Sequence, residues 1–201
     1  MPINGILNSV IMDKAQIRKE IIEKRKSLTP EETCMLLHKV IDQLGQFDFE
    51  KIKVVHIYLP IRKKNEIDTF PIIQFLKLIA PHLVVVIPRS NFNTFELENV
   101  VYNSETILME NNFGIMEPVG GEVIPIENID MVICPLLGFD SNGYRVGYGK
   151  GFYDRFLSIC REDVIKVGLS YFEAIDAIKD INEKDVKLNF AISPKKFLSF
   201  A

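Results

Sequence analysis

The chain has 201 residues, 47% of them apolar and 25% charged, a balance typical of one globular domain with a continuous core. Its formal net charge of −3 lacks the basic excess that a nucleic-acid partner requires. No apolar run approaches the roughly 20 residues of a membrane span, and Cys34, Cys134 and Cys160 have neither disulfide nor zinc-ligand spacing. We therefore expect a cytoplasmic protein without a membrane or nucleic-acid partner.

The amino-terminal end predicts a leader followed by a helix. Residues 1–12 are mildly apolar and carry no Lys or Arg, unlike a secretory signal, so we expect a loose leader before a single domain at residues 13–201. Apolar residues then recur at helical spacing through residues 13–27, where Asp13 is suited to cap the amino end.

A capping box predicts the start of a second helix. Thr29 can accept the amide hydrogen of Glu32, whose side chain can reach back to Thr29, and Pro30 suits the first helical position. The helix is expected to run to about Leu44, with Gly45 as the left-handed residue that ends it.

In the rest of the chain, short β-branched apolar runs alternate with helical segments. The runs predict buried strands at residues 54–59, 83–87, 129–134 and 164–169, and the helical segments are residues 69–80 and 152–160. A further strand is predicted at residues 95–101 and an irregular loop at residues 103–125. This alternation predicts a single-domain α/β fold of three α/β/α layers with a mostly parallel central sheet. Ligands of such folds bind beyond the carboxyl ends of the strands.

The segment before the last of these helices has the composition of an anion-binding turn. Gly147, Gly149 and Gly151 leave every second residue without side-chain bulk, so the backbone amides can approach a phosphate closely. The helix that follows adds the unpaired amides of its first turn, and Arg145 and Lys150 add positive charge. Phosphate binding is the functional interpretation, and a tight connection without a ligand is the alternative.

The segment fits neither of two common phosphate-binding fingerprints. Tyr144 stands where a P-loop has its first glycine, Gly151 stands where Ser or Thr should follow the lysine, and Phe152 replaces the last glycine of a dinucleotide fingerprint. Asp154 also has two interpretations, since it can complement the helix dipole or hold magnesium beside a nucleotide phosphate.

Residues 142–157, NGYRVGYGKGFYDRFL, resemble the signature of the 5-formyltetrahydrofolate cyclo-ligase family. Shorter pieces similar to the family occur in the right order, so that the resemblance spans about Lys14 to Leu188. These pieces are Lys14–Arg18, Tyr58–Pro60, Glu66–Thr69, Ile87–Arg89, Gly114–Pro118 and Asp185–Leu188. The chain departs from some relatives at Tyr148, where they carry Arg, and at residues 63–65, which lengthen one loop.

The resemblance implies an ATP- and Mg²⁺-dependent enzyme. Members of the family convert 5-formyltetrahydrofolate and ATP into 5,10-methenyltetrahydrofolate, ADP and phosphate, by phosphorylating the formyl oxygen and letting N10 attack the activated carbon. By this resemblance Lys150 and Arg145 are catalytic, and Asp154 and Asp185 bind magnesium. The implied ATP-binding residues are Lys14, Arg18, Arg145, Gly147, Tyr148, Gly149, Lys150, Gly151, Phe152 and Tyr153, and the implied folate-binding residues are Leu59, Glu66, Tyr148 and Phe152.

Alternatives to these roles stay open from the sequence. Lys14 and Arg18 also fit a solvated basic helix face, and Phe152 also fits a core stripe with Phe156 and Ile159. The protein could instead be another phosphate-ligand enzyme on the same scaffold, such as a sugar-phosphate isomerase, or a non-catalytic nucleotide- or folate-binding module. The histidines are assigned no chemistry, and a monomer is expected.

Overall fold

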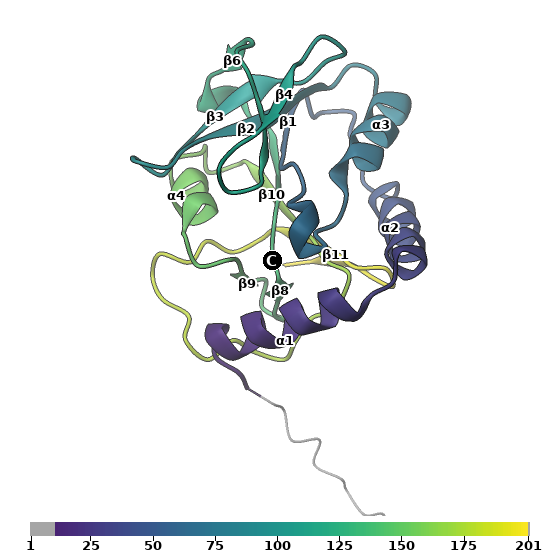
Figure 1. The fold of residues 1–201 in the computed structure, drawn as a ribbon, viewed down its shortest axis with the longest axis vertical. Helices are drawn as coiled ribbons and strands as arrows, with labels where there is room; N and C mark the ends of the chain where they lie inside the picture. The colour runs from purple at the N-terminus through teal and green to yellow at the C-terminus, as the bar shows by residue number, and fades with distance from the viewer. Residues whose placement is uncertain (1–10, 201) are drawn as a thin grey trace, which may run out of the picture.

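The computed structural model describes residues 11–200, which form an α/β fold (Figure 1). The helices are α1 (Lys14–Ser27), α2 (Pro30–Leu44), α3 (Thr69–Ile79) and α4 (Phe152–Ser158), with the 3₁₀ turns η1 (Arg62–Lys64) and η2 (Ile126–Asn128). The strands are β1 (Val54–Ile57), β2 (Val84–Asn91), β3 (Glu96–Val101), β4 (Leu108–Glu110), β5 (Met116–Pro118), β6 (Val123–Ile124), β7 (Met131–Cys134), β8 (Gly138–Phe139), β9 (Arg145–Val146), β10 (Ile165–Leu169), β11 (Phe190–Ile192) and β12 (Phe197–Ser199). Of the predicted leader, residues 1–10 lie outside the described residues, and Met12 forms an isolated bridge with Ile178.

The strands of residues 11–200 form one large sheet and two short hairpins. The eight-stranded sheet has the order β12-β11-β10-β7-β1-β2-β3-β6. Strands β11, β10, β7, β1 and β2 are parallel, whereas β12 at one edge and β3 and β6 at the other pair antiparallel. The hairpins are β4 with β5 and β8 with β9. The predicted α/β class with a mostly parallel central sheet is confirmed.

The central strands are recognisable from sequence because both faces of the sheet are covered. Val55 of β1 pairs with Val85 on one side and Met131 on the other, and all three side chains are buried. Parallel strands covered on both faces read as continuous apolar runs. β2 extends beyond its predicted end at Ile87 because it continues into an antiparallel hairpin with β3, as far as the pair Asn91 and Glu96.

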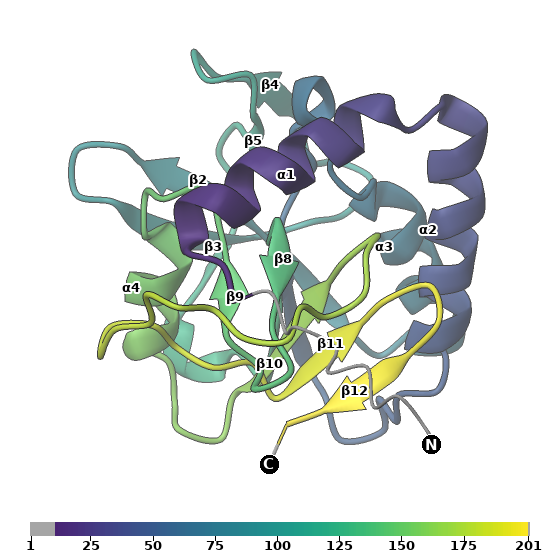
Figure 2. The ribbon, with the colours of Figure 1, turned by 90° about the horizontal axis from the view of Figure 1, so that it is seen from below.

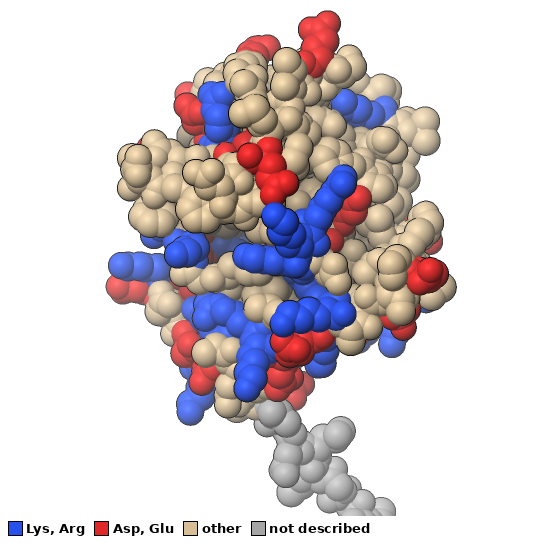
Figure 3. All heavy atoms as spheres, in the orientation of Figure 1, with Lys and Arg blue, Asp and Glu red and all other residues tan. Residues whose placement is uncertain are grey.

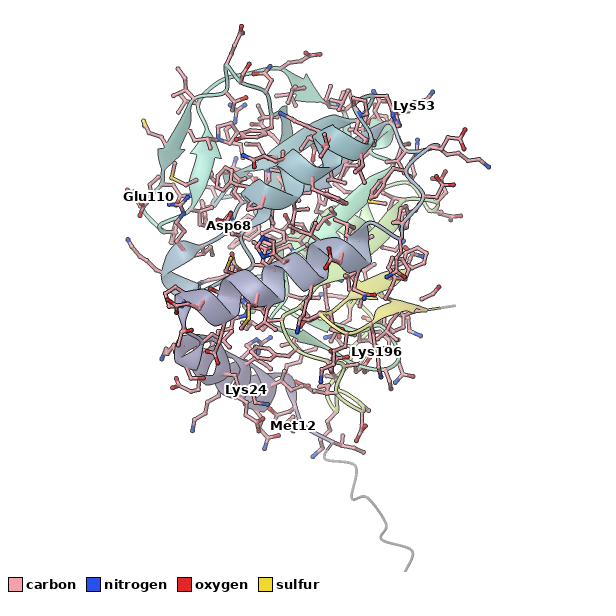
Figure 4. All side chains as sticks on the ribbon, turned by 90° about the vertical axis from the view of Figure 1, so that its right-hand side faces the viewer. Met12, Lys24, Lys53, Asp68, Glu110 and Lys196 are labelled. Carbon is pink, nitrogen blue, oxygen red and sulfur yellow. The ribbon has the colours of Figure 1, made fainter. Side chains whose placement is uncertain are left out.

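Helices α2 and α3 cover one face of the sheet and α4 covers the other. Val40 of α2 and Ile72 of α3 share an apolar cluster with Val55, and Figure 4 shows the two helices side by side. Phe156 of α4 belongs to the cluster that contains Val132 on the opposite face. Helix α1 belongs to neither layer, because it contacts β8, β9 and η1 and so crosses the loops at the end of the sheet (Figure 2).

The helix ends confirm two predictions and correct one. Asp13 and Thr29 each cap a helix, as predicted, and the capping box predicted at Thr29 is present. Asp13 forms a capping box with Gln16 as well. The prediction that Gly45 is left-handed is wrong, because its φ of −62° is right-handed. A Cβ at Gly45 would lie 3.2 Å from the Phe75 ring, so glycine here permits the close approach of α3. None of the helices in residues 11–200 has the length and apolarity needed to cross a bilayer.

The prediction of an irregular loop at residues 103–125 is also wrong, since the segment contains β4, β5 and β6. Strand β6 adds to the edge of the large sheet, where Ile124 pairs with Asn99 and Val123 with Val100. Strands of two or three residues are too short to show a two-residue periodicity, so the sequence carries no clear signal for them.

Candidate active site

The order of the central sheet reverses between β1 and β7. From β1 the chain proceeds to β2 on one side, whereas β7 and β10 lie on the other side of β1. In open α/β sheets such a switch point opens a crevice beyond the carboxyl ends of the strands, where ligands bind. The loop after β1 carries Leu59 and Glu66, and the segment after β7 carries the glycine-rich loop. The two predicted binding segments therefore flank one switch point.

A buried aspartate shapes the chain before the glycine-rich loop. The Asp140 carboxylate accepts the amide hydrogens of Asn142 and Tyr144 through Oδ1, at 3.0 and 2.9 Å, and that of Ile178 through Oδ2, at 3.1 Å. An aspartate that binds backbone amides two and four residues ahead stabilises a tight turn. This turn joins β8 to β9 and so fixes the direction in which the chain enters the loop at Gly147.

The glycine-rich loop, residues 147–151, requires glycine at two positions and packs against α1. Gly149 and Gly151 have φ angles of +89° and +70°, a region that is strained for residues with a Cβ. The Arg18 guanidinium donates from Nε to the Gly147 carbonyl at 2.8 Å, and a Cβ at Gly149 would lie 3.6 Å from it. Arg18 therefore contacts the loop, and its implied role in ATP binding stays a prediction.

Each predicted magnesium ligand is paired with a predicted ATP-binding residue. The buried Arg145 guanidinium donates to Asp154 at 2.7 Å and to the Val186 carbonyl, and Lys14 donates to Asp185. Lys14 is buried and Arg18 half-buried, so the alternative of a solvated basic face is wrong. Residues 11–200 contain no group of three or more acidic, histidine or cysteine side chains arranged to hold a metal ion.

Positive charge gathers on the face that contains the loop. Figure 3 shows Lys and Arg side chains across its middle, between the β2–β4 strands at the top and α1 at the bottom. Lys150 is exposed at the end of the glycine-rich loop, whereas Arg145 is enclosed beneath it. The two predicted catalytic residues thus have different surroundings, one open to a ligand and one held by protein atoms.

Two of the predicted folate-binding residues, Glu66 and Tyr148, lie beside a cation that the sequence does not identify. Glu66 Oε2 accepts the Ile61 amide hydrogen at 2.6 Å, Tyr148 lies near its carboxylate, and burial raises the pKa of Glu66. The buried Arg25 guanidinium donates to the same hydroxyl at 3.0 Å and to the Leu136 carbonyl. Among the described residues, Arg25 Nε has no hydrogen-bond partner. The available signal was spacing, because Arg25 continues the buried stripe of α1 one turn after Ile21.

The aromatic residues that follow the loop point in different directions. Phe152 lies against Phe92 and Phe95 of the β2–β3 hairpin, with ring centroids 5.4 Å apart in both pairs. The alternative of a core stripe through Phe152 and Ile159 is wrong, because Ile159 is 66% exposed. The Tyr153 hydroxyl lies 3.0 Å from Nε2 of His56, which is fully buried. His56 is therefore a core histidine.

The fold and the site together define an α/β enzyme with a glycine-rich, cation-lined loop at the switch point of its sheet. The family model of the 5-formyltetrahydrofolate cyclo-ligase family matches residues 10–194. The chain belongs to this family, a family of ligases in folate metabolism, and the resemblance seen in residues 142–157 is confirmed.

Relatives and solved structures agree with this assignment. The 5-formyltetrahydrofolate cyclo-ligase of Mycoplasma pneumoniae is 32% identical over 185 residues, which cover 90% of this chain and 99% of the relative. That of Mus musculus is 27% identical over 191 residues, 88% of this chain and 91% of the relative. The NMR structure of Aquifex aeolicus 5,10-methenyltetrahydrofolate synthetase superposes with a TM-score of 0.74 at 31% identity and covers 92% of both chains. The Mycoplasma pneumoniae synthetase gives 0.71 at 28% identity, over 91% of this chain and 99% of that one.

Proposed function

We propose that this protein converts 5-formyltetrahydrofolate and ATP into 5,10-methenyltetrahydrofolate, ADP and phosphate in a Mg²⁺-dependent reaction. The observation that carries the proposal is the pairing of two segments at one switch point. The glycine-rich loop and Arg18 stand on one side and Glu66 stands on the other, and Tyr148 of the loop lies near Glu66. A substrate that bridges a phosphate site and a pterin site fits this arrangement.

The phosphate side would act by alignment and by stabilising charge. Phosphoryl transfer needs little covalent chemistry from the protein, so fixed cations and backbone amides supply most of the catalysis. Lys150, exposed at the loop end, would contact the transferring phosphate, while Lys14 and Arg18 hold the rest of the triphosphate. Arg145 would act through the loop, because its guanidinium already binds Asp154 and Val186. Phosphorylation of the formyl oxygen would prepare the carbon for attack by N10.

The carboxylates fit a magnesium ion that arrives with the nucleotide. Mg²⁺ in such sites keeps several waters and binds one or two carboxylates together with substrate phosphates. Asp154 and Asp185 are the residues that would hold it, and their present partners are Arg145 and Lys14. When bound, the ion would neutralise charge on the phosphate oxygens.

The folate side would orient the pterin ring by hydrogen bonds and apolar contact. The Glu66 carboxylate is buried and hydrogen-bonded, so its direction is fixed before any ligand binds. Tyr148 presents a hydroxyl near Glu66, and Phe152 offers partly exposed aromatic surface. Leu59, which is buried, would form an apolar wall behind the ring. We expect this reaction to be carried out by a cytoplasmic monomer acting on a small-molecule substrate.

An absorbance assay tests the proposal. Purified protein, Mg²⁺-ATP and 5-formyltetrahydrofolate are mixed, and the near-ultraviolet absorbance of the methenyl product is followed. We expect product only when all three ligands are present. Turnover without ATP would favour another enzyme on this scaffold. Heat of ligand binding in a calorimeter without any product would instead favour a non-catalytic binding module.

A further inference from the structure

A chain of three polar side chains, two of them buried and one partly buried, crosses the face of the sheet beneath α4. His56 of β1 and Asn99 of β3 are almost inaccessible to solvent and lie beside the apolar cluster of this face. His56 Nδ1 lies 2.8 Å from Asn99 Oδ1, and His56 Nε2 lies 3.0 Å from the Tyr153 hydroxyl. We call this set, Asn99, His56 and Tyr153, the relay.

The hydrogen-bond pattern assigns a direction to every bond of the relay. Asn99 Nδ2 donates to the Ile124 carbonyl, so Asn99 Oδ1 faces His56 and accepts the hydrogen of Nδ1. A neutral imidazole carries one N–H, which leaves Nε2 to accept the hydrogen of the Tyr153 hydroxyl. Burial lowers the pKa of His56 to about 4, so the ring is neutral near pH 7. Each member therefore has a partner in one defined arrangement.

Helix α4 needs such an anchor because its own sequence does little to fix it. The helix has seven residues, and its N-cap residue is Gly151. Glycine has no side chain that could accept an amide hydrogen of the first turn. Helices this short are marginal on their own and depend on tertiary contacts. Tyr153 stands two residues after Gly151 and three after Lys150, so its hydroxyl bond to β1 acts directly at the end of the glycine-rich loop.

Packing alone does not explain the polar groups of the relay. An apolar side chain at residue 56 or 99 would match the surrounding cluster without the cost of removing polar atoms from water. A fully hydrogen-bonded buried network instead selects one orientation of the groups it joins. The group held here is the first turn of α4, in which Asp154, the residue after Tyr153, is bound by Arg145.

We propose that Asn99, His56 and Tyr153 are positioning residues that fix the first turn of α4 and thereby hold the Lys150–Gly151 end of the loop at the crevice. The catalytic part of this inference rests on the proposed function, whereas the anchoring of the loop does not. The relay residues come from three separate elements, and the only one within the glycine-rich signature is Tyr153. Their effect reaches the substrates only through the loop.

The first test compares two substitutions in α4, one that removes only the Tyr153 hydroxyl and one that removes only apolar packing. Tyr153→Phe is expected to lower kcat about tenfold while KM for 5-formyltetrahydrofolate stays within about twofold, because the loop end is displaced and the folate side is intact. Hydrogen exchange should become faster for amides of residues 147–153 and stay unchanged in α2. The matched control is Leu157→Val, a buried position of α4 outside the relay. If the control lowers kcat equally at the same loss of Tm, or if loop exchange is unchanged in Tyr153→Phe, the inference is overturned.

The second test replaces the network by apolar side chains so that no polar side chain of the relay is left unpaired. The combined variant His56→Leu, Asn99→Leu and Tyr153→Phe should keep a Tm near that of the parent, because removing all partners together avoids a buried unsatisfied group. It should nevertheless show the same fast loop exchange and the same loss of kcat as Tyr153→Phe. A variant with parental kcat and parental loop exchange would contradict the positioning role. If the parent itself makes no methenyl product, the proposed function fails, and the exchange measurement alone decides whether the relay anchors the loop.

Discussion

Helices α2 and α4 are specified in different ways, and the difference separates the fold from the site. Helix α2 opens with Thr29, Pro30 and Glu32, so its start is encoded within a few residues by a capping box. Helix α4 opens after a left-handed Gly151 and is held by His56 and Arg145, which come from other strands. The scaffold is therefore encoded locally, whereas the loop that we assign to phosphate binding depends on distant residues.

The largest expected effect comes from removing the cation at the end of the loop. Lys150→Ala should lower kcat more than tenfold, on the order of several kcal/mol if the ammonium contacts the transferring phosphate. Stability should not change, because the side chain is exposed. The matched control is Lys39→Ala on α2, which removes an equally exposed lysine and should leave kcat unchanged. Equal rates for Lys150→Ala and the parent would exclude the catalytic role.

The pH dependence of unfolding tests whether His56, the partner of Tyr153 in α4, is neutral in the folded protein. The unfolded chain binds a proton at His56 below its ordinary pKa of 6.5, whereas the folded protein does so only below about 4. The contribution of neutral, buried His56 to the free energy of unfolding is therefore present above pH 6.5 and is lost as the pH falls toward 4. Between pH 7 and pH 5 the parent should lose about 2 kcal/mol more unfolding free energy than the variant with His56→Leu and Asn99→Leu.

Urea unfolding at the two pH values measures this difference. His38→Gln on α2 is the control, because it replaces an exposed histidine outside the relay. Identical pH dependence of the parent and the apolar variant would show that His56 is not held neutral in the core.

Replacing the glycine that precedes α4 should affect both stability and turnover. Gly151→Ala forces a Cβ into a left-handed residue and places it 3.2 Å from Arg155 Nη1. The expected loss of unfolding free energy is roughly 1–2 kcal/mol, and kcat should fall because the loop end moves. Denaturant unfolding and the absorbance assay measure the two effects. A fully active Gly151→Ala variant would mean that this backbone conformation is not needed for turnover.

The same kind of change at the start of α2 should affect stability alone. Thr29→Ala removes the side-chain oxygen that accepts the Glu32 amide hydrogen and should cost about 1 kcal/mol. We expect kcat to stay at the parental value, because α2 lies on the face of the sheet remote from α4. A drop in kcat would break the separation between locally encoded scaffold and distantly held site.

The smallest expected effect concerns magnesium. Asp154→Asn keeps the shape of the side chain but removes the charge that now pairs with Arg145, so a higher Mg²⁺ concentration should be needed for half-maximal rate. The matched control is Glu31→Gln, an acidic residue in the first turn of α2. If Asp154 only complements the helix dipole, magnesium titrations of both variants will coincide with that of the parent.

Most of the fold is predictable because its signals are local. The capping boxes at Asp13 and Thr29 and the continuous apolar runs of β1, β2, β7 and β10 identify elements within short windows of sequence. Strands β4, β5 and β6 are missed because two or three residues are too few to show a repeated alternation. Gly45 is misassigned because its role is contact with Phe75 across the chain, which no local pattern records.

The same distinction between local and distant signals applies to the residues of the candidate site. The glycine-rich loop is found from sequence because its residues are contiguous, and the structure brings Arg18 of α1 into contact with it. Arg25, His56 and Asn99 are not found, although each is a polar residue inside an apolar pattern. Such a residue is ambiguous until its partners are known, because only the folded chain brings Tyr148 to Arg25 and Tyr153 to His56.

The most direct test of the account is a crystal structure of the protein with ADP and Mg²⁺. We expect the terminal phosphate of ADP to lie against backbone amides between Arg145 and Tyr153, with the Lys150 ammonium in contact with it. A nucleotide bound elsewhere, or a loop whose amides are hydrogen-bonded to the protein itself in that complex, would contradict the assignment of this turn as the phosphate site.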